Sequence, residues 1–411
     1  MLVFSRKATP YFIGFWFLSS IYDHFQHPNF SFRINLKWTL LITSLFIVYL
    51  VFYLFSDFSK EASKALEIKA SFLVVPSALL LRKKQISKKE LQLIFLSFQV
   101  ACLCSATYLI SKLVPALLNQ WNFLKPEEFT YAIRTFMENT LGIHPTYLSI
   151  YYLFSIYLVA TAQGIELITT NRRIIIAFKI FAIILLSTIC ILMVARAPLL
   201  AFVFSLVAVA TLKNWKKGLF SMLIAAIVSI ASIALIPSIG NRFKEVIESE
   251  AINEKTNSVN SSNLRKSILS CSKLIISDNW LGGVGLDNVQ KELNNCYDTY
   301  GNKELSNRNY NSHNQYFDVI LSLGILGFIL FIIILIFPFF GLDAFNYSSF
   351  LFFKLFMLIC FVTENILNRQ HGIVFFVVFN CLYISNYLWF KNQLSKPKMN
   401  ENIFLESLDN Q

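Results

Sequence analysis

The sequence predicts an all-α polytopic membrane protein, and three observations support that fold class. Hydrophobic residues make up 55% of the 411 residues, only 15% are charged, and the mean hydropathy is +0.56. The chain contains 41 phenylalanines, more than is usual for a soluble protein of this length. Several apolar runs approach the length of about 20 residues that a helix needs to cross a bilayer. A set of soluble domains is therefore excluded.

Ten apolar segments are the expected spans, and they should be helical because backbone groups in lipid need hydrogen-bond partners within the segment. Segment 68–81 is short and contains Pro76, so we expect a kink, or snorkelling by the flanking Lys69. The apolar stretch from Tyr11 to Tyr22 is an extra or partial span, which gives about 10–12 membrane helices. The expected spans are 38–55, 68–81, 91–110, 147–162, 174–194, 197–212, 219–236, 316–340, 350–363 and 372–390.

Short clusters of basic residues predict how the spans are oriented. These clusters lie in segments 82–89, 172–173 and 213–217, which fall on one side when the expected spans alternate. An excess of Lys and Arg marks the cytoplasmic side, and the tail 391–411 falls there too. The net charge of +12 is therefore read as a topology signal, and no nucleic acid is expected as a partner.

The expected organisation is N-terminal membrane helices in 1–236, a long loop in 237–312, C-terminal membrane helices in 313–390 and a cytoplasmic tail. The loop carries nine basic and nine acidic residues, so it shows no positive bias and should lie outside the cytoplasm. Its segment NSSNLRKSILSCSKLI has the apolar spacing of an amphipathic helix lying on the membrane surface. Cys271 and Cys296 lie in the loop and should pair in an oxidising compartment.

Polar residues that are candidates for function gather on the predicted outer face. Each alone has an ordinary explanation, such as snorkelling, solvent exposure or helix capping, but their common placement favours a site. Asp318, just inside the outer end of a span, is either part of that site or a buried polar partner. The candidates are Arg196 in VARAPLLAF, Arg265 in the amphipathic segment, His144 in GIHPTY, His313 at the start of a span, and Arg369 and His371 in TENILNRQHG.

The glycines of WLGGVGLDN have two interpretations. Successive backbone N–H groups in such a segment can form an anion-binding nest. A turn between a loop helix and the next segment is the more common role of such a stretch. The sequence contains no phosphate-loop lysine motif, CxxC or HExxH that would indicate a soluble enzyme.

In this order the motifs resemble those of the O-antigen ligase/O-antigen polymerase superfamily of bacterial membrane glycosyltransferases. His313-Asn314, nine further residues and then GILG at 324–327 fit the ligase pattern. VARAPLLAF is similar to the family's arginine-containing span junction. LRKSILSCSKLIISDNWLGGVGLDN is similar to its outer-loop helix followed by Gly-Val-Gly. The similarity is strongest over residues 144–371, while the first hundred residues match only as generic spans and fall short of the family's usual twelve.

The resemblance implies a GT-C type fold in the bacterial inner membrane and an undecaprenyl diphosphate-linked glycan as the donor. The acceptor is the lipid A core in a ligase and another lipid-linked repeat in a polymerase. The resemblance also assigns site residues: His313 as the catalytic residue, Arg196 and Arg265 as diphosphate binders, and Asn314, Arg369 and His144 as further substrate contacts. No cofactor or metal is expected, because arginine forks match diphosphate oxygens and no Asp/Glu cluster has metal-ligand spacing.

His313 is expected to act as the general base for the acceptor hydroxyl, because a histidine is largely neutral near neutral pH. Asn314 either orients the imidazole or a sugar hydroxyl, or simply caps the following helix. Gly324 and Gly327 should allow another helix to pack closely. Two other functions in the superfamily stay open, a polysaccharide polymerase and a protein O-oligosaccharyltransferase. A lipid-linked glycan flippase is disfavoured, since it should carry charges along a midmembrane path.

Overall fold

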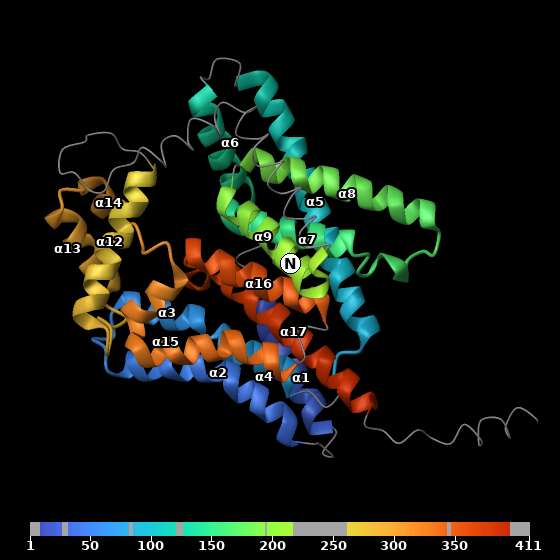
Figure 1. Ribbon diagram of the computed structural model, residues 1–411, viewed down its shortest axis with the longest axis horizontal. Helices are drawn as coiled ribbons and strands as arrows, with labels where there is room; N and C mark the ends of the chain where they lie inside the picture. Colours follow the sequence, from blue (N-terminus) through green and yellow to red (C-terminus); the bar gives the residue numbers. More distant parts are fainter. Residues whose placement is uncertain are drawn as a thin grey trace, which may run out of the picture.

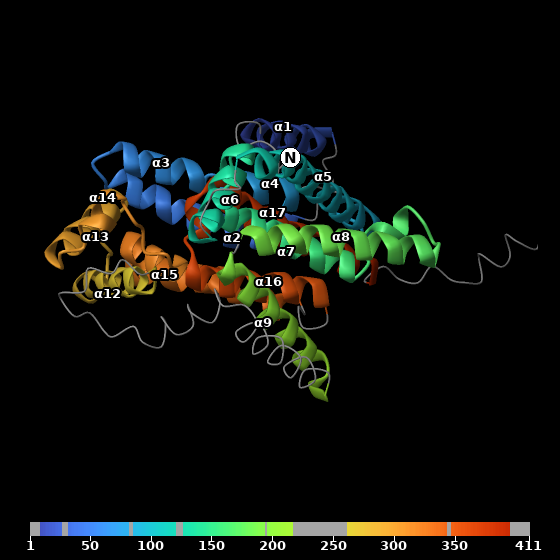
Figure 2. The same ribbon diagram turned by 90° about the horizontal axis from the view of Figure 1, so that it is seen from above.

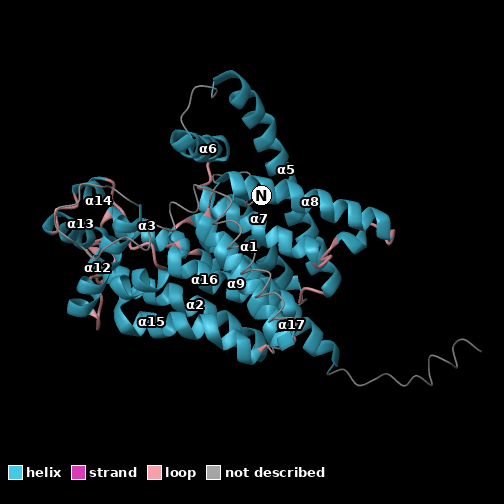
Figure 3. Ribbon diagram, turned by 45° about the horizontal axis from the view of Figure 1, so that its top comes forward, coloured by secondary structure: helices cyan, strands magenta, loops and turns pink. Residues whose placement is uncertain are grey.

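The computed structural model describes residues 9–26, 32–81, 85–120, 126–193, 195–216, 261–342 and 347–394. Within these ranges the secondary structure is helical and contains no strand (Figure 3), so the all-α fold class is confirmed. The elements are α1 (Thr9–Gln26), α2 (Phe32–Leu54), α3 (Lys60–Lys69), α4 (Ser71–Leu80), α5 (Lys88–Gln120), α6 (Pro126–Leu141), α7 (Pro145–Ala160), η1 (Ile165–Leu167), α8 (Arg172–Met193), α9 (Arg196–Lys213), α12 (Ser261–Asn279), α13 (Val289–Thr299), α14 (Lys303–Asn307), α15 (Gln315–Gly341), α16 (Ser348–Thr363), η2 (Ile366–Asn368) and α17 (Gln370–Leu394).

Six of the described helices are long and apolar enough to cross a membrane, namely α2, α5, α8, α9, α15 and α17. Helices α7 and α16 are shorter but equally apolar, and each overlaps an expected span. The protein is therefore a multi-pass membrane protein. The expected span 219–236 and the basic residues at 82–84 lie outside the described residues.

The expected span 68–81 is wrong as a full membrane crossing. The segment is divided at Ala70 between α3 and α4, and α4 has only 10 residues. A helix of that length is about 15 Å long, half the hydrocarbon thickness of a bilayer. Lys69 does not snorkel to the surface, because its side chain is buried and its Nζ donates to the Leu367 carbonyl at 2.6 Å. Helix α4 instead packs inside the protein against α1, α2 and α17.

The expected span 316–340 is not one continuous helix. Gly324 has φ 65° and ψ −165°, which interrupts α15. The ring centroids of Tyr316 and Phe331 lie 6.0 Å apart, whereas fifteen residues of straight helix would separate them by about 22 Å. The first part of α15 therefore folds back against the second part, and the glycine provides the turn.

The glycine-rich stretch after α12 packs against that turn, which supports the turn interpretation of the motif. Val284 N donates to the Leu321 carbonyl at 2.7 Å, and Ile325 N donates to the Trp280 carbonyl at 2.9 Å. A Cβ added to Gly324 would lie 2.1 Å from the Leu281 carbonyl oxygen, so the backbones approach too closely for a side chain. The Gly283 N–H is also used, since it donates to the Asn279 carbonyl at 2.8 Å. These N–H groups are therefore not available to form an anion-binding nest.

Helices α12, α13 and α14 form a separate layer at one end of the membrane helices, as both views show (Figures 1 and 2). A disulfide between Cys271 and Cys296 joins α12 to α13, which confirms the predicted pairing. Ile268 and Ile275 of α12 pack with Leu321 of α15 in a small core. Part of the predicted apolar face is therefore covered by protein, while Leu269 and Leu274 are exposed, so the placement of this helix on the membrane surface stays a prediction. We call α12–α14 the loop layer.

Aromatic rings fill the centre of the membrane helices. Phe154 of α7 lies 4.9 Å from Phe379 of α17 and 5.3 Å from Phe353 of α16, measured between ring centroids. Phe98 of α5 joins the same cluster at 5.0 Å from Phe379. The phenylalanine-rich composition thus produces a rigid core, and the ends of α7, α16 and α17 position the side chains described below.

The basic clusters lie at the opposite end of this bundle from His313. Ile86 N donates to Ser385 Oγ, which brings the start of α5 to the end of α17. Tyr157 Oη donates to the Ser348 carbonyl, which brings the end of α7 to the start of α16. The described basic residues of the clusters sit at this end: Lys88, Lys89, Arg172, Arg173, Lys213, Lys216 and Lys391. The arrangement agrees with the predicted alternation, and the assignment of this end to the cytoplasm stays a prediction.

Candidate functional site

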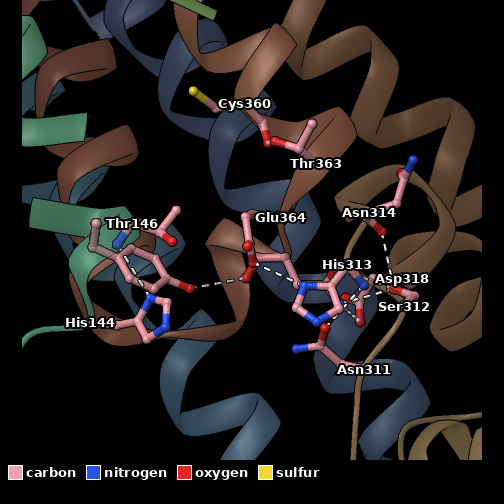
Figure 4. A network of polar contacts seen from close by, with 12 residues as sticks. His144, Thr146, Asn311, Ser312, His313, Asn314, Asp318, Cys360, Thr363 and Glu364 are labelled. Carbon is pink, nitrogen blue, oxygen red and sulfur yellow. Dashed lines mark hydrogen bonds and ion pairs between the residues drawn. The ribbon is translucent and has the colours of Figure 1, made fainter. Parts of the chain in front are cut away.

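His313 and Glu364 form a polar pair near the start of α15, the membrane helix that the loop layer contacts (Figure 4). The Nδ1 atom of His313 lies 3.3 Å from Oε2 of Glu364, and the two side chains are 27% and 18% exposed. Glu364 follows directly after α16, where its N–H donates to the Cys360 carbonyl at 3.2 Å. The pair is thus held at helix ends and is partly accessible.

The backbone at His313 adopts an unusual conformation that directs its side chain. Its φ of +44° is in the left-handed region, which costs a residue other than glycine about 1–3 kcal/mol. The Asn311 side chain supports the turn, because its Oδ1 accepts a hydrogen bond from His313 N at 3.0 Å. The Tyr310 ring lies 5.8 Å from the imidazole centroid. A strained residue held in this way is typical of functional sites.

The contact with Glu364 defines what the imidazole can do. A carboxylate beside Nδ1 favours the tautomer with the proton on that atom, which leaves Nε2 free to accept a proton. Our sequence reasoning did not single out Glu364. The available signal was its position as the sole acidic residue of the turn TENILNRQHG, beside two of the proposed candidates.

Asn314 caps α15, so the capping alternative is confirmed. Its Oδ1 accepts hydrogen bonds from Tyr316 N at 2.9 Å and Phe317 N at 3.1 Å. A cap of this kind typically stabilises a helix by about 1 kcal/mol. Since the side-chain oxygen is used in this way, Asn314 contributes to the site mainly by fixing where α15 begins.

His144 caps α7 close to the pair, with its Nδ1 accepting from Thr146 N at 3.3 Å. Burial is the main cause that lowers the pKa of His144, so its neutral form is favoured. Two carboxylates oppose this shift and two guanidiniums add to it, which shows that charged groups surround the ring. These groups are Glu138, Glu364, Arg134 and Arg369.

Arg196 and Arg265 differ in their placement. Arg196 is the first residue of α9 and is exposed. The Ser149 hydroxyl of α7 lies 3.8 Å from the sulfur of Met193 at the end of α8, so α9, which follows α8, begins near the end of the bundle where α7 begins. Arg265 is exposed on α12, and no contact within the described ranges joins it to the histidine–glutamate pair. The structure therefore brings His313, Glu364, His144 and Arg369 together and leaves Arg265 in the loop layer.

Fold and site together define a multi-pass membrane protein with a partly buried His–Glu pair near the start of α15, the helix against which a disulfide-bonded helical layer packs. Residues 181–332 match a family model described as O-antigen ligase. This match runs from α8 to the second part of α15 and includes Arg196, Arg265 and His313. It confirms the resemblance of this part of the chain to the O-antigen ligase/polymerase superfamily, whose members are enzymes. A comparison with curated proteins found no significant match.

Proposed function

We propose that this protein transfers a glycan from undecaprenyl diphosphate to an acceptor hydroxyl on the periplasmic face of the bacterial inner membrane. The proposed acceptor is the lipid A core, as in an O-antigen ligase. The observation that supports the proposal is the contact between His313 and Glu364, at the end of the bundle opposite the basic clusters. The His313 side chain is 27% exposed, so an acceptor can reach the imidazole.

The proposed reaction is a single displacement at the anomeric carbon. The acceptor oxygen forms the new bond to that carbon while its proton moves to Nε2 of His313. The bond from the carbon to the phosphate oxygen breaks, and its electron pair leaves with undecaprenyl diphosphate. Glu364 stabilises the imidazolium until the proton passes to water. A positioned base of this kind contributes about 10²–10⁴ in rate.

Arginine side chains are the proposed partners of the departing diphosphate. A guanidinium matches two phosphate oxygens in a bidentate fork, and the leaving group gathers negative charge as the bond breaks. We assign this role to Arg196, at the start of α9, and to Arg369, which acts electrostatically on His144. Arg265 lies on α12, so it would bind the diphosphate from the loop layer. The reaction uses the energy of the activated donor, and its independence of metal ions stays a prediction.

A purified-protein assay with labelled donor tests the proposal. We expect His313→Gln, which has a similar size but no basic nitrogen, to lose about 10²–10⁴ in turnover while still binding the donor. Arg308→Gln is the matched control, since Arg308 is exposed and lies five residues earlier. Turnover of His313→Gln at the wild-type rate would overturn the assignment of the base.

Deletion of the gene separates the alternatives within the superfamily. Accumulation of unattached polymer indicates a ligase, and single repeats indicate a polymerase. Loss of glycan from a protein, with lipopolysaccharide intact, indicates a protein O-oligosaccharyltransferase. Donor that stays accessible only from the cytoplasm indicates a flippase and would contradict the proposed chemistry.

A further inference from the structure

A layer of buried polar side chains lies directly beneath the His313–Glu364 pair. Ser312, Asp318 and Asn365 are each less than 5% exposed. The Nδ2 atom of Asn365 donates to Ser312 Oγ at 3.0 Å and to Asp318 Oδ1 at 3.0 Å. Buried polar groups inside a membrane protein are costly and usually have a functional reason. We call these three side chains the polar layer.

The polar layer connects the two chain segments that carry the pair. Ser312 immediately precedes His313, and Asn365 immediately follows Glu364. The hydrogen bond between Ser312 and Asn365 therefore fixes the two backbones at neighbouring positions. A second bond parallel to it, from Leu367 N to Gln315 Oε1 at 2.7 Å, fixes the same segments one step further along.

Asp318 is the central acceptor of this arrangement. Its Oδ1 accepts from Asn365 and also from Asn368 Nδ2 at 2.7 Å, and its Oδ2 lies 3.3 Å from Gln315 Nε2. These donors are all neutral amides. Asp318 therefore holds the turn after α16 against the start of α15, which are the two places where the pair is attached.

Lys69 of α3 supplies the opposite charge. Its Nζ donates to the Leu367 carbonyl at 2.6 Å and to Asn368 Oδ1 at 2.8 Å, and it interacts electrostatically with Asp318. A buried carboxylate without a nearby cation would be strongly unfavourable. Lys69 thus stabilises Asp318 through Asn368, and it brings a third helix to the layer.

We propose that Asp318 and Asn365 are positioning residues that set the distance between His313 and Glu364, with Lys69 as their counter-charge. The inference rests on the proposed function, because it concerns the same base. Both side chains are buried beside the pair. They act by keeping Glu364 beside Nδ1, so that the Nε2 side of the imidazole is presented to the acceptor.

Isosteric exchanges test the proposal. Asn365→Asp places two carboxylates in contact, and Asp318→Asn removes the charge that faces Lys69. We expect each to lower kcat about 10–100-fold while KM for the donor stays within about twofold. In the double variant Asn365→Asp/Asp318→Asn, the amide at position 318 can donate to the carboxylate at position 365, which reverses the wild-type hydrogen bond. This variant should therefore recover most of the turnover.

The split between kcat and KM, together with recovery in the double variant, distinguishes positioning from a merely structural role. A structural role lowers the amount of folded protein, whereas displacement of Glu364 from Nδ1 of His313 lowers kcat per folded molecule. If a single variant does not fold, Ser312→Ala provides the same test, since it removes only one hydroxyl. Ser205→Ala is the control, because Ser205 is also buried and its hydroxyl donates to the Ala201 carbonyl within α9.

The proposed function and this inference fail in different ways. If His313→Gln turns over normally, the base is misassigned and the inference fails with it. If His313→Gln is inactive while Asn365→Asp, Asp318→Asn and Ser312→Ala keep the wild-type kcat per folded molecule, only the positioning role is overturned. A loss of folded protein with unchanged kcat would also overturn it, since that is the result of a structural role alone.

Discussion

Lys69 and Lys354 are both buried, but their surroundings differ. Lys69 donates two hydrogen bonds at 2.6 and 2.8 Å and faces the carboxylate of Asp318. Lys354 lies in the aromatic core, with its Nζ 5.4 Å from the centroid of the Phe376 ring and 3.5 Å from Asn380 Oδ1. A network of specific bonds defines a geometry, whereas contact with ring faces tolerates many geometries. The comparison indicates that specific hydrogen bonds hold the end near Lys69 in one geometry, as the proposed site requires, whereas the core around Lys354 is organised by packing.

The largest effect is expected from Lys69→Met, which removes the cation from the polar layer. The Asp318 carboxylate would then be buried without an opposite charge, which typically costs about 3–5 kcal/mol. The thermal unfolding temperature of the purified protein should fall clearly, and glycan transfer should be lost. Lys69→Arg is the control that keeps the charge. An unchanged unfolding temperature in Lys69→Met would show that Asp318 does not depend on this lysine.

Removal of the disulfide should affect the same end of the molecule. Closing a loop of 25 residues between Cys271 and Cys296 stabilises the fold by about 3 kcal/mol in the chain-entropy model. We expect Cys271→Ser/Cys296→Ser to increase hydrogen exchange in the loop layer and at the start of α15, while α16 and α17 stay protected. Cys104→Ser is the control, because Cys104 is free and exposed. If hydrogen exchange increased equally in the aromatic core of α16 and α17, the disulfide would not act on the loop layer and the start of α15 in particular.

Most of the membrane helices could be predicted from the sequence, since apolar runs reflect composition along the chain. The sequence also predicted that His313, His144 and Arg369 lie at one end of the bundle, while their roles stay a prediction. The fold-back of α15 could not be predicted, because hydropathy averages across Gly324 and does not register a left-handed turn inside an apolar segment. The role of Lys69 was also missed. A lysine beside an apolar run resembles a snorkelling residue, and its partners in η2 lie about 300 residues further along the chain.

A smaller effect concerns pH and the other histidine at the polar end. Burial lowers the pKa of His144, so the folded protein binds fewer protons there than the unfolded chain. Its contribution to stability is therefore present above the ordinary pKa of 6.5 and is lost as the pH falls. His144→Gln should reduce the drop in unfolding temperature between about pH 7.5 and pH 5.5. If the variant shows the same drop as the wild type, other groups carry this pH dependence.

The smallest effect is expected at Lys354. Methionine has a similar length and adapts to irregular apolar spaces, so Lys354→Met should fit among the rings of Phe339 and Phe376. The replacement leaves Asn380 without its nearest cation, and Asn380 Nδ2 already has no hydrogen-bond partner within the described ranges.

The double variant Lys354→Met/Asn380→Leu therefore removes the polar pair as a unit, and such replacements are often neutral or stabilising. We expect its unfolding free energy to change by no more than about 1 kcal/mol and its kcat to equal that of the wild type. The measurement is transfer per folded molecule beside thermal unfolding. Unchanged stability with lost transfer would mean that the lysine in the aromatic core also serves the reaction, and the two regions would no longer differ in the way that their contacts suggest.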